Sequence, residues 1–175
     1  MNPVARELWL KLFDPSQYLS NVRCPILFVN GTTDFAYPLD SYQKSYRLVP
    51  EKWRFVSVAV DRPHGHIWTF PEVDAFVASI LKQGRPPVRL GKAVERAGRL
   101  SAKLTRMVSP KEASLCYTTD SGVWQKRQWH TVPAQMNGNE ISAELPKERP
   151  LVAFLSIKDE ENCHSSSEHV ELNAR

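Results

Sequence analysis

Apolar positions in the first half of the chain follow two periods, one typical of helices and one typical of buried strands. Residues 3–13 carry apolar side chains at helical spacing, which predicts an amphipathic helix packed on a core. Residues 25–30 and 54–60 are short apolar runs of the kind that form strands buried on both faces. Helical spacing returns over residues 39–49 and 73–81. The order helix, strand, helix, strand, helix indicates a parallel α/β sheet.

The pattern changes at Gly84-Arg85-Pro86-Pro87. Beyond this point short extended segments alternate with turn residues and helical spacing is absent, which predicts an all-β sandwich. We therefore divide the chain into residues 1–83, an α/β portion, residues 84–111, a basic linker with the first strand, and residues 112–175, the remainder of the sandwich.

Charge is concentrated in the linker. Residues 85–111 hold eight Lys and Arg against one Asp or Glu, a net charge of +7 in a chain of net charge +4. No interleaved aromatic side chains are available to stack bases, so we expect a solvated linker and no nucleic-acid partner. No apolar run approaches the roughly 20 residues that span a bilayer, so no membrane partner is expected.

Candidate chemistry follows the two buried strands. Asp34 comes after the first strand, and His64 and His66 come after the second. The carboxyl ends of parallel strands meet at one edge of a sheet, where a carboxylate can accept the Nδ1–H of an imidazole and fix its tautomer. Asp34 could instead make only an Asx-turn. Two histidines could also bind a metal ion, but no third ligand is nearby, and the three separated cysteines make no metal-spaced pair. We expect no metal and no cofactor.

The segment Cys24–Trp68, with its CPILFVNGTTDFAYP and PHGH motifs, resembles the final catalytic part of α/β-hydrolases of the acetylxylan esterase and dienelactone hydrolase kind. A β-sandwich follows the hydrolase domain in that group, and Tyr117–Trp129 and Ser165–His169 resemble its hallmarks. The resemblance covers roughly residues 14–170. It implies an α/β fold, the C-terminal segment of an α/β-hydrolase parallel sheet followed by a small all-β sandwich, with residues 1–83 as the C-terminal portion of the hydrolase domain.

The resemblance also implies catalytic roles. Asp34 would be the triad acid and His66, in the usual Gly-His position, the triad base, with His64 as the alternative. The chain contains no Gly-x-Ser-x-Gly, so the nucleophile and the oxyanion hole are expected upstream of residue 1. The implied function is that of a C-terminal fragment of a serine-type carboxylic ester hydrolase. Its substrate would be an ester, acylated carbohydrates included, and its partner the missing N-terminal hydrolase segment. The chain alone is expected to be inactive.

Two alternatives stay open: a non-catalytic module that binds carbohydrate or protein, and a remnant without activity. Two buried-type strands without sheet neighbours expose apolar surface, so we also expect the chain to dimerise or aggregate. Trp124 and Trp129 are interpreted as packing residues rather than sugar-stacking ones. Ser165–Ser167 are interpreted as polar residues of a turn or strand edge rather than as nucleophiles.

Overall fold

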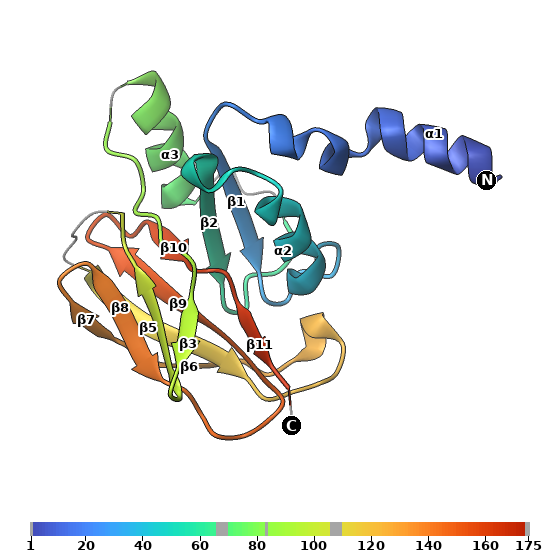
Figure 1. Cartoon of the computed structure of the whole chain (residues 1–175). Coiled ribbons are helices and arrows are strands. Elements are labelled where there is room, and N and C mark those ends of the chain that lie inside the picture. The colour runs from blue at the N-terminus through green and yellow to red at the C-terminus, as the bar shows by residue number, and fades with distance from the viewer. Residues whose placement is uncertain (1, 66–69, 83, 106–109, 174–175) are drawn as a thin grey trace.

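The computed structural model describes residues 2–65, 70–82, 84–105 and 110–173 of the 175-residue chain. The described elements form two parts that pack on each other (Figure 1): two parallel strands with α-helices, and a larger antiparallel region. The first part contains α1 (Pro3–Phe13), β1 (Ile26–Gly31), α2 (Leu39–Arg47), β2 (Arg54–Ala59) and α3 (Pro71–Leu81). The second contains β3 (Val94–Arg96), β4 (Arg99–Lys103), β5 (Pro110–Thr118), β6 (His130–Pro133), β7 (Gln135–Asn137), β8 (Glu140–Glu144), β9 (Leu151–Asp159), β10 (His164–Ser166) and β11 (Val170–Leu172).

The elements of the first part form where the apolar periods predict them. β1 and β2 pair in parallel, from Ile26 opposite Arg54 to Gly31 opposite Ala59. α3 begins with a proline at its first position and carries Glu72 and Asp74 in its first turn, which suits the positive end of the helix dipole. The helix and strand assignments for this half of the chain are therefore confirmed.

The predicted fold class is wrong. Among the described strands, β1 and β2 form a parallel sheet of two strands, whereas an α/β-hydrolase sheet needs many more. The remaining described strands are all antiparallel. The apolar run of a strand reports that both its faces are covered, but it does not report how many strands lie beside it. The chain is a β-rich protein in which the parallel pair is the smaller component.

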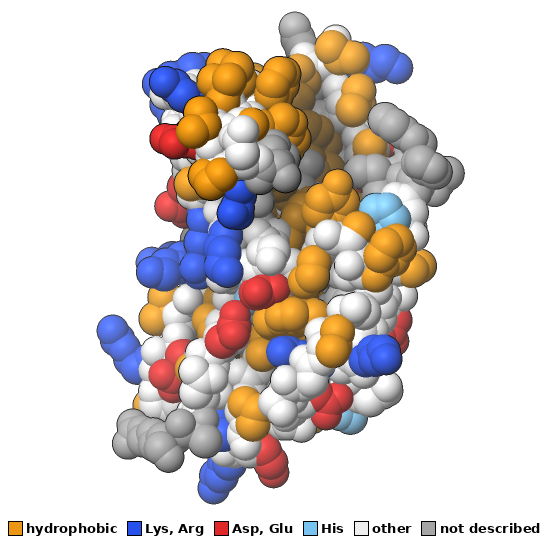
Figure 2. All heavy atoms as spheres, turned by 90° about the vertical axis from the view of Figure 1, so that its right-hand side faces the viewer, with side chains coloured by type: hydrophobic (Ala, Val, Ile, Leu, Met, Phe, Trp, Pro, Cys, Tyr) orange, Lys and Arg blue, Asp and Glu red, His pale blue; other side chains and the backbone are white. Residues whose placement is uncertain are grey.

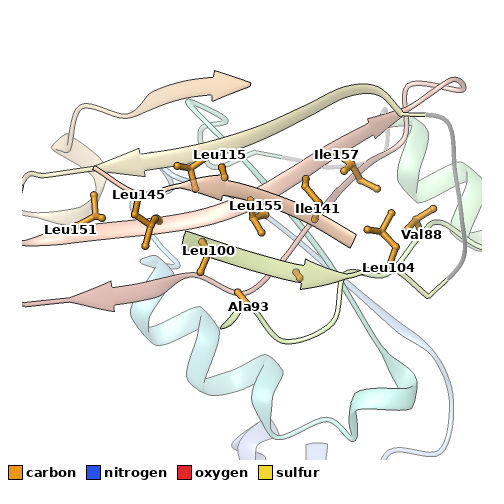
Figure 3. Packing of buried hydrophobic residues seen from close by; sticks show 13 residues of the cluster. Val88, Ala93, Leu100, Leu104, Leu115, Ile141, Leu145, Leu151, Leu155 and Ile157 are labelled. Atoms are coloured by element: carbon orange, nitrogen blue, oxygen red, sulfur yellow. The ribbon is translucent and has the colours of Figure 1, made fainter. Parts of the chain in front are cut away.

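The antiparallel region consists of two sheets. One has the order β10-β9-β5-β6, with β11 also paired to β9, and the other has the order β3-β4-β8-β7. A core of leucine, isoleucine, valine and alanine side chains lies between the two sheets (Figure 3). Leu115 and Leu155 enter it from the first sheet, and Leu100 and Ile141 enter it from the second; all four are fully buried.

β9 is buried on both of its faces. Successive side chains of a strand point to opposite faces, so Leu155 joins the core between the sheets while Phe154 points toward the parallel pair. Phe154 packs there with Leu39, Val58 and Cys116. The parallel pair β1–β2 is therefore a third layer, packed on the outer face of the β10-β9-β5-β6 sheet.

The two tryptophans lie at this joint between the parts. Trp129 and Trp124 pack against the Phe154 cluster, and Trp129 lies 5.4 Å from the Phe154 ring. The guanidinium of Arg127 lies 3.7 Å from the ring centre of Trp124. Their interpretation as packing residues is confirmed.

α1 differs from its prediction in one respect. The helix forms, with Asn2 accepting the Ala5 N–H at its start, but it contains no buried residue. It projects away from the body of the molecule on the side of β1 (Figure 1). The predicted packing of α1 on a core is therefore wrong. No helix in the described ranges has the length and apolarity that a membrane crossing requires.

Candidate functional site

The two loops that follow β1 and β2 meet at one edge of the parallel pair. The side chain of Thr32, just after β1, accepts the N–H of Asp61, just after β2, at 2.9 Å. The Thr32 N–H donates to the carbonyl of Ala59 at 3.1 Å. Asp61 has a φ of 57°, which turns the second loop back toward the first. These two hydrogen bonds hold the loops together independently of Asp34 and His64.

Gly31 is required by this close approach. A methyl group placed on Gly31 would lie 1.7 Å from the carbonyl oxygen of Arg62. Only a residue without Cβ allows the two loops to come this close.

Asp34 is the buried anchor of the site. Its Oδ1 accepts the N–H groups of Ala36 and Tyr37 at 2.8 and 2.9 Å, which is an Asx-turn. Its Oδ2 lies 3.0 Å from Nδ1 of His64. One carboxylate oxygen of Asp34 therefore makes the Asx-turn, and the other contacts the imidazole of His64.

His64 is fixed on one side and open on the other. A carboxylate only accepts hydrogen bonds, so the neutral imidazole carries its proton on Nδ1 and leaves the Nε2 lone pair free to accept. The ring lies between Phe35 and Tyr37, with ring centres 5.0 and 5.8 Å away. The His64 side chain keeps 39% of its surface exposed. Among the described residues Nε2 has no hydrogen-bond partner, so it is available to a ligand.

His66, which the sequence favoured as the catalytic histidine, lies outside the described residues. The described partner of Asp34 is His64, the alternative left open by the sequence. The preference for His66 came from its Gly-His position alone. The structure adds that Phe35 and Tyr37, both in the turn that follows Asp34, place their rings beside His64.

A pocket of about 250 Å³ adjoins the pair. Asn30, Tyr37, Tyr42, Arg62 and His64 contribute to its wall. Burial, followed by the nearby charge of Asp34, raises the pKa of the Tyr42 hydroxyl well above its usual value, and this hydroxyl donates to the carbonyl of Val29. Tyr42 is therefore a neutral wall of the pocket and not an acid at physiological pH.

A second polar cluster, which the sequence did not reveal, lies under the joint between the two parts. Glu72 accepts from Ser57 at 2.9 Å and from Arg62 at 2.9 Å. Ser57 Oγ is 3.3 Å from Nδ1 of His164, and Ser156 Oγ is 2.7 Å from its Nε2. Burial lowers the pKa of His164 to about 4, so its imidazole is neutral at pH 7 and a weak base. These hydrogen bonds join the two parts, and the cluster also lines a cavity of about 440 Å³.

The serines near the C-terminus belong to the same joint. Ser166 Oγ accepts the N–H of Val58 at 2.9 Å, and Ser167 Oγ accepts the N–H of Leu155 at 3.0 Å. Both serines satisfy backbone donors at strand edges, as the sequence interpretation stated. In the part of the chain that the structure describes, no group of three or more His, Cys, Asp or Glu side chains could hold a metal ion.

No protein-family model and no curated protein matches the chain. Among solved structures, it is similar to CopC from Methylosinus trichosporium OB3b, with 11% sequence identity and a TM-score of 0.36. The match covers 50% of this chain and 94% of that chain. So low a score carries no argument about function.

The family search and the sheet topology together overturn the family resemblance. No hydrolase family model matches the chain, and the parallel sheet of the described residues has two strands. The assignment to acetylxylan esterase-like α/β-hydrolases is wrong, and the ester-hydrolase function derived from it falls with it. The motifs that suggested the family describe a local arrangement of two strands and two loops.

Proposed function

We propose that the Asp34–His64 pair is a proton-accepting site, in which Nε2 of His64 takes a proton from a small molecule bound in the adjoining pocket. The observation that carries the proposal is the 3.0 Å contact between Oδ2 of Asp34 and Nδ1 of His64. Asp34 holds the imidazole in the tautomer that presents a lone pair and stabilises the imidazolium formed on proton transfer.

The surroundings support this role. The Asp34 side chain is only 8% exposed and is itself held by two backbone N–H groups, so the carboxylate cannot turn away from the ring. His64 combines this fixed side with an exposed one. A general base needs both, because it must be oriented yet reachable by the proton it removes.

The pocket, of about 250 Å³ and open to solvent, has room for a small molecule beside His64. Asn30 is already engaged with the carbonyl of Tyr37 and the N–H of Gly31, so it shapes the wall rather than offering free donors. We therefore expect a compact, largely apolar substrate with one acidic C–H, O–H or S–H group near His64.

A nitrobenzisoxazole ring-opening assay tests the proposal, because that reaction needs a base and nothing else. His64 would take the ring C–H proton, its electron pair would form the nitrile, and the N–O bond would break to release a coloured phenolate. A general base contributes about 10²–10⁴-fold, so His64→Ala should lower the rate by about a hundredfold or more. Asp34→Asn keeps an oxygen for the two N–H groups but should also reduce the rate, because a carboxamide stabilises imidazolium poorly.

Two matched variants serve as controls. His130 is an exposed histidine that stacks on Tyr117, and His130→Ala should leave the rate unchanged. His66→Ala decides between the two loop histidines: loss of the rate in this variant, with His64→Ala unaffected, would return the role to His66. A chain no faster than an equal concentration of free imidazole would refute the proposal.

A further inference from the structure

A series of aromatic rings runs from the core of the smaller part to its surface. The Tyr46 side chain is buried, and the Tyr42 ring lies 6.0 Å from the Tyr46 ring. The Tyr37 ring lies 6.2 Å from the Tyr42 ring, and both distances lie in the range of roughly 4.5–7 Å at which aromatic rings attract each other. The series ends at Tyr37, which is 56% exposed. Its outermost ring is therefore backed by the core and open to solvent.

This open ring stands beside the proposed base. Tyr37 and Tyr42 both contribute to the wall of the pocket that adjoins Asp34 and His64. The ring centre of Tyr37 lies 5.8 Å from that of His64. Figure 2 shows this side of the molecule, where a histidine side chain lies at the surface with hydrophobic side chains directly beside it. A molecule in the pocket therefore meets aromatic rings and the available Nε2 of His64 together.

The charged groups in the described wall of this pocket are already paired. The carboxylate of Asp34 contacts His64 at 3.0 Å, and the guanidinium of Arg62 donates to Glu72 at 2.9 Å. An ionised ligand would lose its water without gaining a counter-charge of its own, which is costly. The pocket is therefore better suited to a neutral molecule.

We infer that the substrate of the proton-accepting site is a neutral molecule with an aromatic ring, which packs on Tyr37 while its acidic group reaches His64. This inference rests on the proposed function and names the class of its substrate. Two aromatic rings attract each other beyond the burial of their area, because the negative face of one meets the positive edge of the other. A saturated ring of the same size gains only the burial.

Two substitutions at Tyr37 test the inference in the nitrobenzisoxazole assay, where KM reports binding as long as proton transfer is slower than release. Tyr37→Phe keeps the ring and removes the hydroxyl, so KM should stay within about twofold of the wild type. Tyr37→Leu removes the ring, so KM should rise about three- to tenfold. In both variants kcat should be kept, because the backbone N–H that Asp34 accepts and the Asp34–His64 contact are unchanged. Trp9→Leu removes an aromatic ring of similar exposure, 50%, on α1 and should change neither constant.

A pair of unreactive ligands tests the preference for a ring without the reaction. Benzyl alcohol and cyclohexylmethanol match in size and in their hydroxyl group, but cyclohexylmethanol is the more apolar. Burial alone would favour cyclohexylmethanol, whereas packing on Tyr37 favours benzyl alcohol. Titrations followed by the amide NMR signals of Ala36 and Tyr37 should give a Kd about threefold lower or more for benzyl alcohol. The preference should be absent in Tyr37→Leu.

The inference and the proposed function can fail separately. A rate that depends on His64, together with equal KM values for Tyr37→Leu and the wild type, would keep the base and overturn the aromatic substrate. Tighter binding of cyclohexylmethanol than of benzyl alcohol would also overturn the inference, whatever the rates. Preferential binding of benzyl alcohol by a chain whose rate is unchanged in His64→Ala would refute the proton-accepting role and keep the pocket as a site for aromatic ligands.

Discussion

His164 makes the stability of the fold depend on pH, and the effect can be calculated from its surroundings. The imidazole lies at the joint between β2, β9 and β10, where it is partly buried, and its two nitrogens face Ser57 and Ser156. Burial lowers its pKa to about 4; the positive charge of Arg62 acts in the same direction, and Glu72 opposes it. In the unfolded chain the pKa returns to about 6.5.

Between pH 6.5 and 4 the unfolded chain therefore binds a proton that the folded chain does not. The free energy of unfolding rises with pH wherever the unfolded state binds more protons, so His164 makes the protein less stable as the pH falls through this window. The full effect is about 3 kcal/mol, since each unit of pKa difference corresponds to about 1.4 kcal/mol. About 2 kcal/mol of it should be lost between pH 7.5 and pH 5.

Urea unfolding at fixed protein concentration from pH 5 to pH 8 measures this quantity. His164→Gln keeps hydrogen-bonding groups near the serines but cannot ionise in this range, so its stability should fall by about 2 kcal/mol less than that of the wild type. Burial also lowers the pKa of His169, which adds a slope of the same sign to both proteins and cancels in their difference. Parallel profiles for the wild type and His164→Gln would show that His164 takes up its proton over the same pH range in the folded and unfolded chains, and that the reasoning is wrong.

Two further predictions concern the positions of single side chains. Gly31→Ala should destabilise the fold by about 1–3 kcal/mol, because its methyl group would meet the carbonyl of Arg62, whereas Gly122→Ala, with nothing within 4 Å, should change stability by less than about 0.5 kcal/mol. Equal effects of the two glycine variants on the urea midpoint would contradict the close approach of the loops. Leu155→Ala should cost about 2–5 kcal/mol, since Leu155 is fully buried between the two sheets, and the exposed Val123→Ala should cost less than about 0.5 kcal/mol. A small loss for Leu155→Ala would mean that the core between the sheets is not closely packed.

Local periodicity was sufficient to locate most of the secondary structure. The runs that became β1 and β2 were located because they are continuously apolar, although four of the six residues in each strand are only partly buried. The sequence of a strand contains no comparable indication of how many strands its sheet has. β2 is bounded by a serine side chain from β10 rather than by another strand, and that arrangement joins residues 108 positions apart.

The candidate site was predictable where it depends on strand order and not where it depends on loop conformation. Asp34 could be located because parallel strands end at a common edge. His64 is brought to Asp34 by a loop that begins at Asp61, whose positive φ is favoured by aspartate only as a tendency and could not be assigned from the sequence. The Glu72–His164 cluster was missed because its members come from segments that no motif connects.

The hydroxyl group of Ser166 makes the smaller part of the protein depend on the end of the chain. Ser166 lies in β10, and its Oγ accepts the N–H of Val58 in β2, 108 positions earlier. A buried amide without a partner is costly, so β2 is fully satisfied only after β10 has taken its place on β9. The order in which the chain is synthesised and the order in which its hydrogen bonds are completed are therefore different: an early strand waits for a late one.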